Sequence, residues 1–153
     1  MNTNRKKYLT IESIFIILVF LFNFIHTNSS YSNSGSHGAD SLTSATWILK
    51  TLNGNDVVKE KAGNEIPYLT LNTKENTVLG STGCNTINGK ISVNADEIKF
   101  SDMSMTKMFC DDAGYEQDFV SALFNDSVVK YKSDNGKLIF YKNDVAIMSF
   151  EKK

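Results

Sequence analysis

The two cysteines are the residues whose type and spacing most directly suggest chemistry. Cys84 and Cys110 are the only cysteines among 153 residues. In an exported protein such a pair first indicates one disulfide bond. The bond would close a loop of about 27 residues and, in the chain-entropy model, would stabilise the fold by about 3.5 kcal/mol. The alternative is a pair of reduced, buried thiols that pack as small apolar side chains.

Histidine is the residue whose distribution excludes most other chemistry. Both histidines, His26 and His37, precede the part of the chain that has globular composition. A Ser-His-Asp or Cys-His nucleophilic site and a histidine zinc site are therefore excluded there, and two cysteines alone do not make a structural zinc site. We expect no metal, no cofactor and no enzyme activity.

Three further stretches carry residues that could form a site. The block of residues 80–85 could offer backbone amides to an anion or a peptide carboxylate, although tight turns explain its glycines better. Thr106 and Met108 could shape a small pocket beside Cys110, although such residues are more often core. An acidic group could do acid–base work or bind calcium, although a solvated helix start explains it better. The acidic group consists of Asp111, Asp112, Glu116 and Asp118.

The N-terminal 29 residues have the composition of a targeting segment. A basic cluster, Arg5 to Lys7, precedes an apolar run from Ile14 to Phe22. This pattern is typical of a secretory signal peptide. It is either cleaved after Ser29 or kept as an uncleaved N-terminal membrane anchor, a transmembrane helix whose membrane contact would be residues 9–26. No cysteine directly follows the apolar run, so the usual lipid attachment point is missing.

The rest of the chain divides into a linker and one domain. Residues 30–45 are rich in serine and glycine, which is the composition of a flexible linker. Residues 46–151 form the predicted domain. The formal net charge of -1, without a basic stripe, argues against a nucleic-acid partner. We expect an extracytoplasmic protein, in the cell envelope or secreted, with a protein or peptide partner.

Short alternating apolar segments fill most of this domain and predict strands. Asn88-Gly89, Asn135-Gly136 and Asn143-Asp144 are predicted turns. A helical period is found over residues 112–126, where Asp111 or Asp112 could cap the helix start. The predicted fold is α+β, a curved antiparallel β-sheet or small β-barrel packed with one α-helix. The strands are predicted at residues 47–51, 57–58, 67–72, 77–80, 90–93, 97–101, 127–132, 137–142 and 145–151.

Two cysteine-bearing blocks, G-C-N and T-x-M-x-C, are specific in combination. The residues of these blocks and their flanks are Trp47, Gly83, Cys84, Asn85, Gly89, Thr106, Met108 and Cys110. In these residues the whole domain resembles the META domain family of HslJ-like, heat-inducible bacterial proteins. The resemblance implies a β-rich fold with one helix, export or lipid anchoring, a loose association with stress response, and no established enzyme activity.

Composition and resemblance together predict an exported, non-catalytic protein. We expect an envelope stress-related module or a protein-interaction module. The alternative is a small-molecule or lipid-binding β-barrel, in which the inward-facing aromatic and aliphatic side chains would surround a ligand.

Overall fold

The computed structural model describes residues 42, 43 and 45–153. The predicted signal peptide or anchor, residues 1–29, and most of the predicted linker, residues 30–45, lie outside the described residues. Within the described part, no helix is long and apolar enough to cross a membrane.

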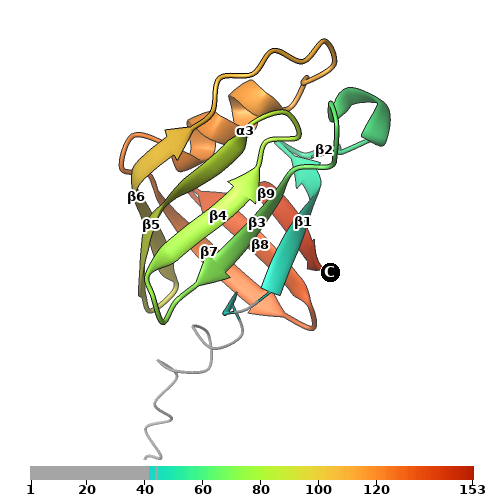
Figure 1. Ribbon diagram of the computed structural model, residues 1–153. Coiled ribbons are helices and arrows are strands. Elements are labelled where there is room, and N and C mark those ends of the chain that lie inside the picture. The colour runs from blue at the N-terminus through green and yellow to red at the C-terminus, as the bar shows by residue number, and fades with distance from the viewer. Residues whose placement is uncertain (1–41, 44) are drawn as a thin grey trace, which may run out of the picture. The chain divides into compact units, whose positions relative to one another are not determined.

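Nine strands form one antiparallel sheet in the described chain, and eight of them close into a barrel (Figure 1). Neighbours in sequence are neighbours around the wall, and β1 closes the ring by pairing with both β3 and β9. β2 pairs only with the end of β1. The strands are β1 (Ala45–Leu52), β2 (Asn55–Asp56), β3 (Tyr68–Asn72), β4 (Thr77–Ser81), β5 (Thr86–Asn94), β6 (Glu97–Met105), β7 (Val128–Asp134), β8 (Lys137–Lys142) and β9 (Val145–Lys152).

The period-two pattern of the sequence directs apolar side chains into the barrel. In β1, Trp47 and Leu49 are buried while Lys50 is exposed. In β8, Leu138 and Phe140 are buried in the same way. The predicted α+β class is therefore correct, and of the two predicted architectures the small barrel is the one formed.

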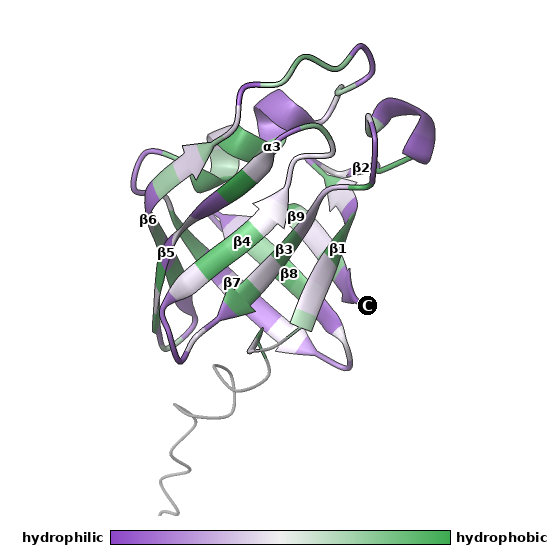
Figure 2. Cartoon of the chain, viewed as in Figure 1, coloured by the Kyte–Doolittle hydropathy of each residue, from purple (hydrophilic) through white to green (hydrophobic). Residues whose placement is uncertain are grey.

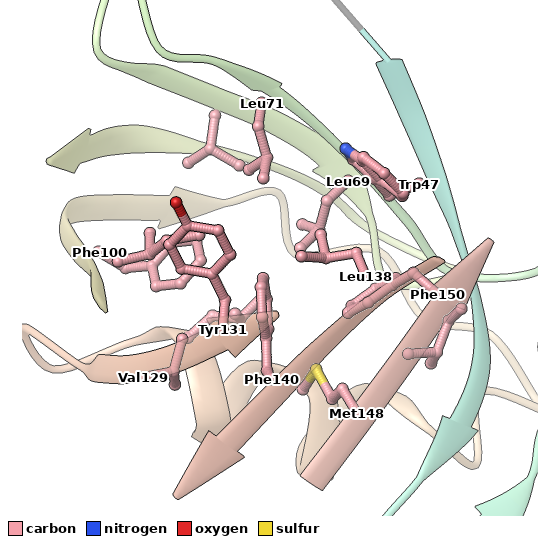
Figure 3. Packing of buried hydrophobic residues seen from close by; sticks show 14 of the residues in the cluster. Trp47, Leu69, Leu71, Phe100, Val129, Tyr131, Leu138, Phe140, Met148 and Phe150 are labelled. Atoms are coloured by element: carbon pink, nitrogen blue, oxygen red, sulfur yellow. The ribbon is translucent and has the colours of Figure 1, made fainter. Parts of the chain in front are cut away.

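Aromatic rings fill the centre of the barrel (Figure 3). The ring centroid of Phe140 lies 5.9 Å from that of Phe100 and 5.2 Å from that of Phe150, both edge to face. Phe119 adds a further edge contact at 6.5 Å from Phe150. Edge-to-face pairs of this kind contribute about 0.5–1.5 kcal/mol beyond the burial of their area. The interior is thus a packed core.

The packed part of the chain reaches back to Leu42, which is fully buried. The indole Nε1 of Trp47 donates a hydrogen bond to the Leu42 carbonyl oxygen at 3.3 Å. The core therefore includes a residue from the stretch that the sequence predicts as linker.

The α-helix α3 (Glu116–Leu123) lies at one end of the barrel, and β1 begins at the other end (Figure 1). β7 pairs with β6 only through Glu97–Lys99, so the connection between these strands leaves the wall. α3 returns from it and buries Phe119 and Leu123 in the core. A short 3-10 helix, η1 (Lys59–Lys61), connects β2 to β3.

The helix is shorter than predicted. It begins at Glu116, and neither Asp111 nor Asp112 caps it, because Ala113 first pairs with Ala62 in a β-bridge. It ends at Leu123, because Phe124 is extended and the two residues after it, 125 and 126, take positive φ values of 62° and 53°.

Of the three predicted turns, two are confirmed and one is wrong. Asn135-Gly136 and Asn143-Asp144 have the paired positive φ values of tight hairpin turns. Asn88-Gly89 instead lies within β5, where it pairs with β4 on one side. Extended pairing on both sides prevailed over the local turn preference, since β6 covers the other edge of β5.

Candidate functional site

The two cysteine-bearing blocks meet at the end of the barrel that carries α3. Cys84 and Cys110 are bonded, and their Cα atoms are 5.9 Å apart. Cys84 is buried, whereas Cys110 is partly exposed. The disulfide therefore joins the β4–β5 connection to the loop of residues 106–112, which follows β6.

Asn85 is the polar centre of this arrangement and is 2% exposed. Its Oδ1 accepts hydrogen bonds from the Met108 amide at 2.6 Å and from the Thr106 hydroxyl at 2.8 Å. Its Nδ2 donates to the Met108 carbonyl at 3.2 Å and to Oε2 of Glu116 at 2.9 Å. One buried amide thus holds both backbone polar groups of Met108 and the start of α3.

The four-residue turn from Thr82 to Asn85 uses its own backbone amides. The Thr82 amide donates to the Asn85 carbonyl at 2.8 Å, and the Thr82 hydroxyl accepts from the Asn85 amide at 2.8 Å and from the Cys84 amide at 3.3 Å. The Gly83 amide donates to the Ser81 hydroxyl at 3.0 Å. Every amide of the turn is engaged, so the turn does not form the anion-binding site considered from the sequence.

Gly83 allows another segment to approach this turn closely. Its φ is 96°, and a Cβ added there would lie 2.0 Å from the Ala62 carbonyl oxygen. The Gly83 carbonyl in turn accepts the Asn64 amide at 2.9 Å. A side chain at this position would separate the turn from the η1 segment.

The loop of residues 106–112 has no buried side chain. Asn85 holds its first half, and the disulfide holds Cys110 in its second half. Between these two attachments, Met108 is 57% and Phe109 is 90% exposed. Figure 2 shows this loop, between β6 and α3, as hydrophobic along its middle and hydrophilic on both sides. An apolar pair is therefore held in solvent by attachments on both sides.

The structure separates the residues that the sequence groups together. Trp47 belongs to the core and Gly89 to β5, where a Cβ would lie 2.3 Å from the Met103 sulfur. Thr106 is exposed but bonds Asn85, and it also accepts the Thr86 amide at 3.1 Å. The interpretation of Thr106 and Met108 as core is wrong, because Asn85 fixes their backbone outside the barrel.

The acidic group does not form one site. Glu116 is directed inward and accepts the Thr82 hydroxyl as well as Asn85. Asp118 instead accepts from Nδ2 of Asn53 at 3.3 Å, while Asp111 and Asp112 are exposed. In the described chain, no three side chains of His, Cys, Asp or Glu are grouped so that they could hold a metal ion.

A shallow groove of about 360 Å³ lies on the outer wall, lined by residues of β6, β7 and β8 and the turn after β8. Lys130 Nζ lies 3.2 Å from Oδ1 of Asp144, and this hydrogen-bonded pair raises the pKa of Lys130. In the adjoining hollow of about 230 Å³, which shares Lys130, Tyr141 and Asp144 with the groove, Lys132 Nζ lies 5.7 Å from the centre of the Tyr141 ring. These two cations already have partners within the wall, so we do not assign the groove as the primary site.

The match to known proteins extends over the whole domain. The META domain family model matches residues 40–153. The chain belongs to the META domain family. No curated protein matches the chain.

Two solved structures show the same fold. An NMR structure of a protein is similar with a TM-score of 0.58 and 17% identity, covering 74% of this chain and 92% of that one. An NMR structure of a protein from Burkholderia xenovorans is similar with a TM-score of 0.58 and 19% identity, covering 75% of this chain and 86% of that one. At such identities the likeness extends to the fold alone.

Sequence reasoning missed Phe109. It lies within the T-x-M-x-C block between Met108 and Cys110, where a phenylalanine beside a half-exposed cysteine is usually core. The only sequence signal was the charge around it, since Lys107 precedes the apolar pair and Asp111 follows it.

Proposed function

We propose that this META-domain protein is exported, is non-catalytic, and binds a protein or peptide partner through the loop of residues 106–112. The observation that carries the proposal is the 90% exposure of Phe109 on a loop that is attached on both sides. Aromatic side chains at the centre of an interface supply much of its binding energy. A loop already held in one conformation avoids the entropic cost of ordering on binding.

Several features support a partner outside the cytoplasm. The disulfide is consistent with an oxidising compartment. The loop and α3 lie at the end of the barrel opposite the start of β1 (Figure 1). The link to envelope stress that the resemblance implies stays a prediction.

The lipid-binding or small-molecule barrel has less support. Trp47, Phe100 and Phe140 are at most 1% exposed inside the barrel. The rings of Phe100, Phe119, Phe140 and Phe150 contact one another across the interior. An acyl chain would have to displace several of these rings, each of which contributes about 3–5 kcal/mol to folding.

Site-specific photocrosslinking in cells tests the proposal. A benzophenone amino acid would replace Phe109 in the full chain or, as a matched control, Leu79. Leu79 is 57% exposed on the outer face of β4, far along the chain from the loop. We expect a discrete adduct from position 109 and none from position 79.

Competition decides whether the adduct is specific. Excess unlabelled chain should abolish the adduct, and the same excess of a Phe109→Ser chain should leave it. Equal adducts from both positions, no adduct from position 109, or competition by the Phe109→Ser chain would contradict the proposal.

A further inference from the structure

The second half of the loop of residues 106–112 depends on one bond. Asn85 holds the backbone only as far as Met108, and the next backbone contacts are the Ala113 bridge and the Gly114 amide, which donates to Lys61 O at 3.0 Å. Between these points, the only other contact with the described part of the chain runs from Asn64 Nδ2 to Cys110 Sγ at 3.8 Å. The disulfide is therefore the sole strong attachment of the described residues from 109 to 112.

Without the bond, little would keep this segment in place. Residues 109–112 contribute no buried side chain to the core. Fixing a backbone residue costs roughly 1–2 kcal/mol, and no apolar burial offsets that cost here. The core cluster lies inside the barrel and includes neither cysteine. Loss of the bond should therefore release the segment while the barrel stays folded.

Of the two cysteines, Cys110 is the more exposed to solvent, which favours attack by a reductant at that sulfur. Cys84 is 7% exposed, whereas Cys110 is partly open. A thiolate of a dithiol reductant would attack Cys110 Sγ, break the S–S bond and release Cys84 as a thiolate that takes up a proton. The second thiol of the reductant would then displace Cys110. The reductant ends as a disulfide, and the protein gains two electrons and two protons as two thiols.

The site can accommodate the reduced form. Cys84 Sγ lies 3.6 Å from the Met108 carbonyl oxygen. In the bonded state the sulfur has no hydrogen to donate, but a Cys84 thiol would be placed to donate weakly to this oxygen. The Asn85 contacts that hold Met108 do not involve either sulfur, so reduction would free Phe109 without releasing the first half of the loop.

From these contacts we propose that the Cys84–Cys110 disulfide is a redox latch on the loop. In the oxidised state it holds Phe109 in position for a partner, and reduction by a dithiol releases residues 109–112 and weakens binding. The latch rests on the proposed function of this loop, because its effect on binding requires that Phe109 contacts a partner.

Limited proteolysis of the purified full chain tests the release directly. Chymotrypsin cleaves after Phe109, and trypsin cleaves after Lys74, an exposed residue in the β3–β4 turn that serves as a control. With dithiothreitol we expect cleavage after Phe109 to accelerate by about tenfold or more, and cleavage after Lys74 to stay unchanged. A Cys84→Ser/Cys110→Ser chain should behave as the reduced protein does without any reductant.

Two results would overturn the latch. Unchanged cleavage after Phe109 would overturn the latch. Acceleration at both positions would also overturn it, because the bond would then hold the whole barrel together.

Crosslinking separates the latch from the proposed function. An adduct at position 109 that persists in the Cys84→Ser/Cys110→Ser chain would contradict the latch and leave the proposed function standing. Absence of the adduct in the oxidised chain would contradict the proposed function, whereas the protease rates would still decide whether the loop is released.

Discussion

At the scale of single residues, Asn85 connects the two halves of the site. Its side chain makes four hydrogen bonds, to Thr106, to both backbone groups of Met108, and to Glu116. A buried amide of this kind is costly to replace, because each partner left without a hydrogen bond costs about 1–3 kcal/mol. The G-C-N block therefore combines a covalent attachment with a polar one.

An Asn85→Asp substitution should make stability depend on pH. The new carboxylate would replace an amide nitrogen that lies 2.9 Å from Glu116, so repulsion from Glu116 would raise the pKa of the new carboxyl group in the folded state. A raised folded-state pKa gives stability at low pH that is lost as pH rises. We expect a loss of about 3 kcal/mol at about pH 7 and partial recovery at about pH 4.

Urea unfolding of the variant at these two pH values provides the measurement. Adding Glu116→Gln should remove most of the extra pH dependence, although the repulsion from the Met108 carbonyl would remain. An equal loss at both pH values would contradict the assigned contact between Asn85 and Glu116.

A Gly83→Ala substitution tests the close approach to the η1 segment. Gly54→Ala is the matched control, because Gly54 also has a positive φ, 79°, but has nothing within 4 Å of an added Cβ. Gly54→Ala should cost about 1–2 kcal/mol from backbone strain alone. Gly83→Ala should cost at least about 2 kcal/mol more, because its Cβ meets a carbonyl oxygen. Equal losses in denaturant unfolding would show that the contact can relax.

At the scale of elements, most strands and two of the three turns were predictable from the sequence, whereas the conformation of Asn88-Gly89 was not. Alternation along β7, β8 and β9 locates these strands to within two residues, because one face of each is buried. The signal of Asn88-Gly89 is local, and it could not reveal that strands on both sides keep this segment extended. The prediction of where α3 begins failed for the same reason, since the bridge between Ala62 and Ala113 is a contact between segments that are distant in the sequence.

Tyr131 connects β7 to the turn between β5 and β6, and its ionisation should affect stability at high pH. Its hydroxyl donates to the Ala95 carbonyl oxygen at 3.2 Å. Burial, with a smaller effect of Asp96, raises the pKa of Tyr131 above its usual 10.0. The folded state thus holds the Tyr131 proton more tightly than the unfolded state does. The contribution of the protonated hydroxyl to folding stability is therefore present below pH 10 and is lost as pH rises further.

The upward shift of the Tyr131 pKa predicts how a Tyr131→Phe variant should behave. At neutral pH the variant should lose about 1 kcal/mol, the value of one hydrogen bond. Between about pH 8 and about pH 11 its stability should fall less steeply than that of the unsubstituted chain. Parallel pH curves from urea unfolding would contradict the assignment.

At the scale of the whole molecule, the barrel and the loop have separate tasks. Closure brings β1 against β9, as where Trp47 pairs with Lys152, and no local pattern predicts a pairing over such a distance. The resulting core has its own contacts and does not need the loop. The loop depends on Asn85 and the disulfide, which leave Phe109 outside. The sequence predicted the cysteine pair but not the exposure of Phe109, because exposure depends on this three-dimensional arrangement.

Binding through the loop of residues 106–112 requires that Phe109 is both exposed and held in place. Backbone ¹⁵N relaxation of the oxidised full chain measures this directly at Met108, Phe109 and Cys110. We predict order parameters above about 0.8 at these three amides, comparable with those of the barrel strands. Values below about 0.6 at Phe109 and Cys110, with the disulfide intact, would show a flexible loop and would contradict the claim that the protein presents a preformed apolar anchor.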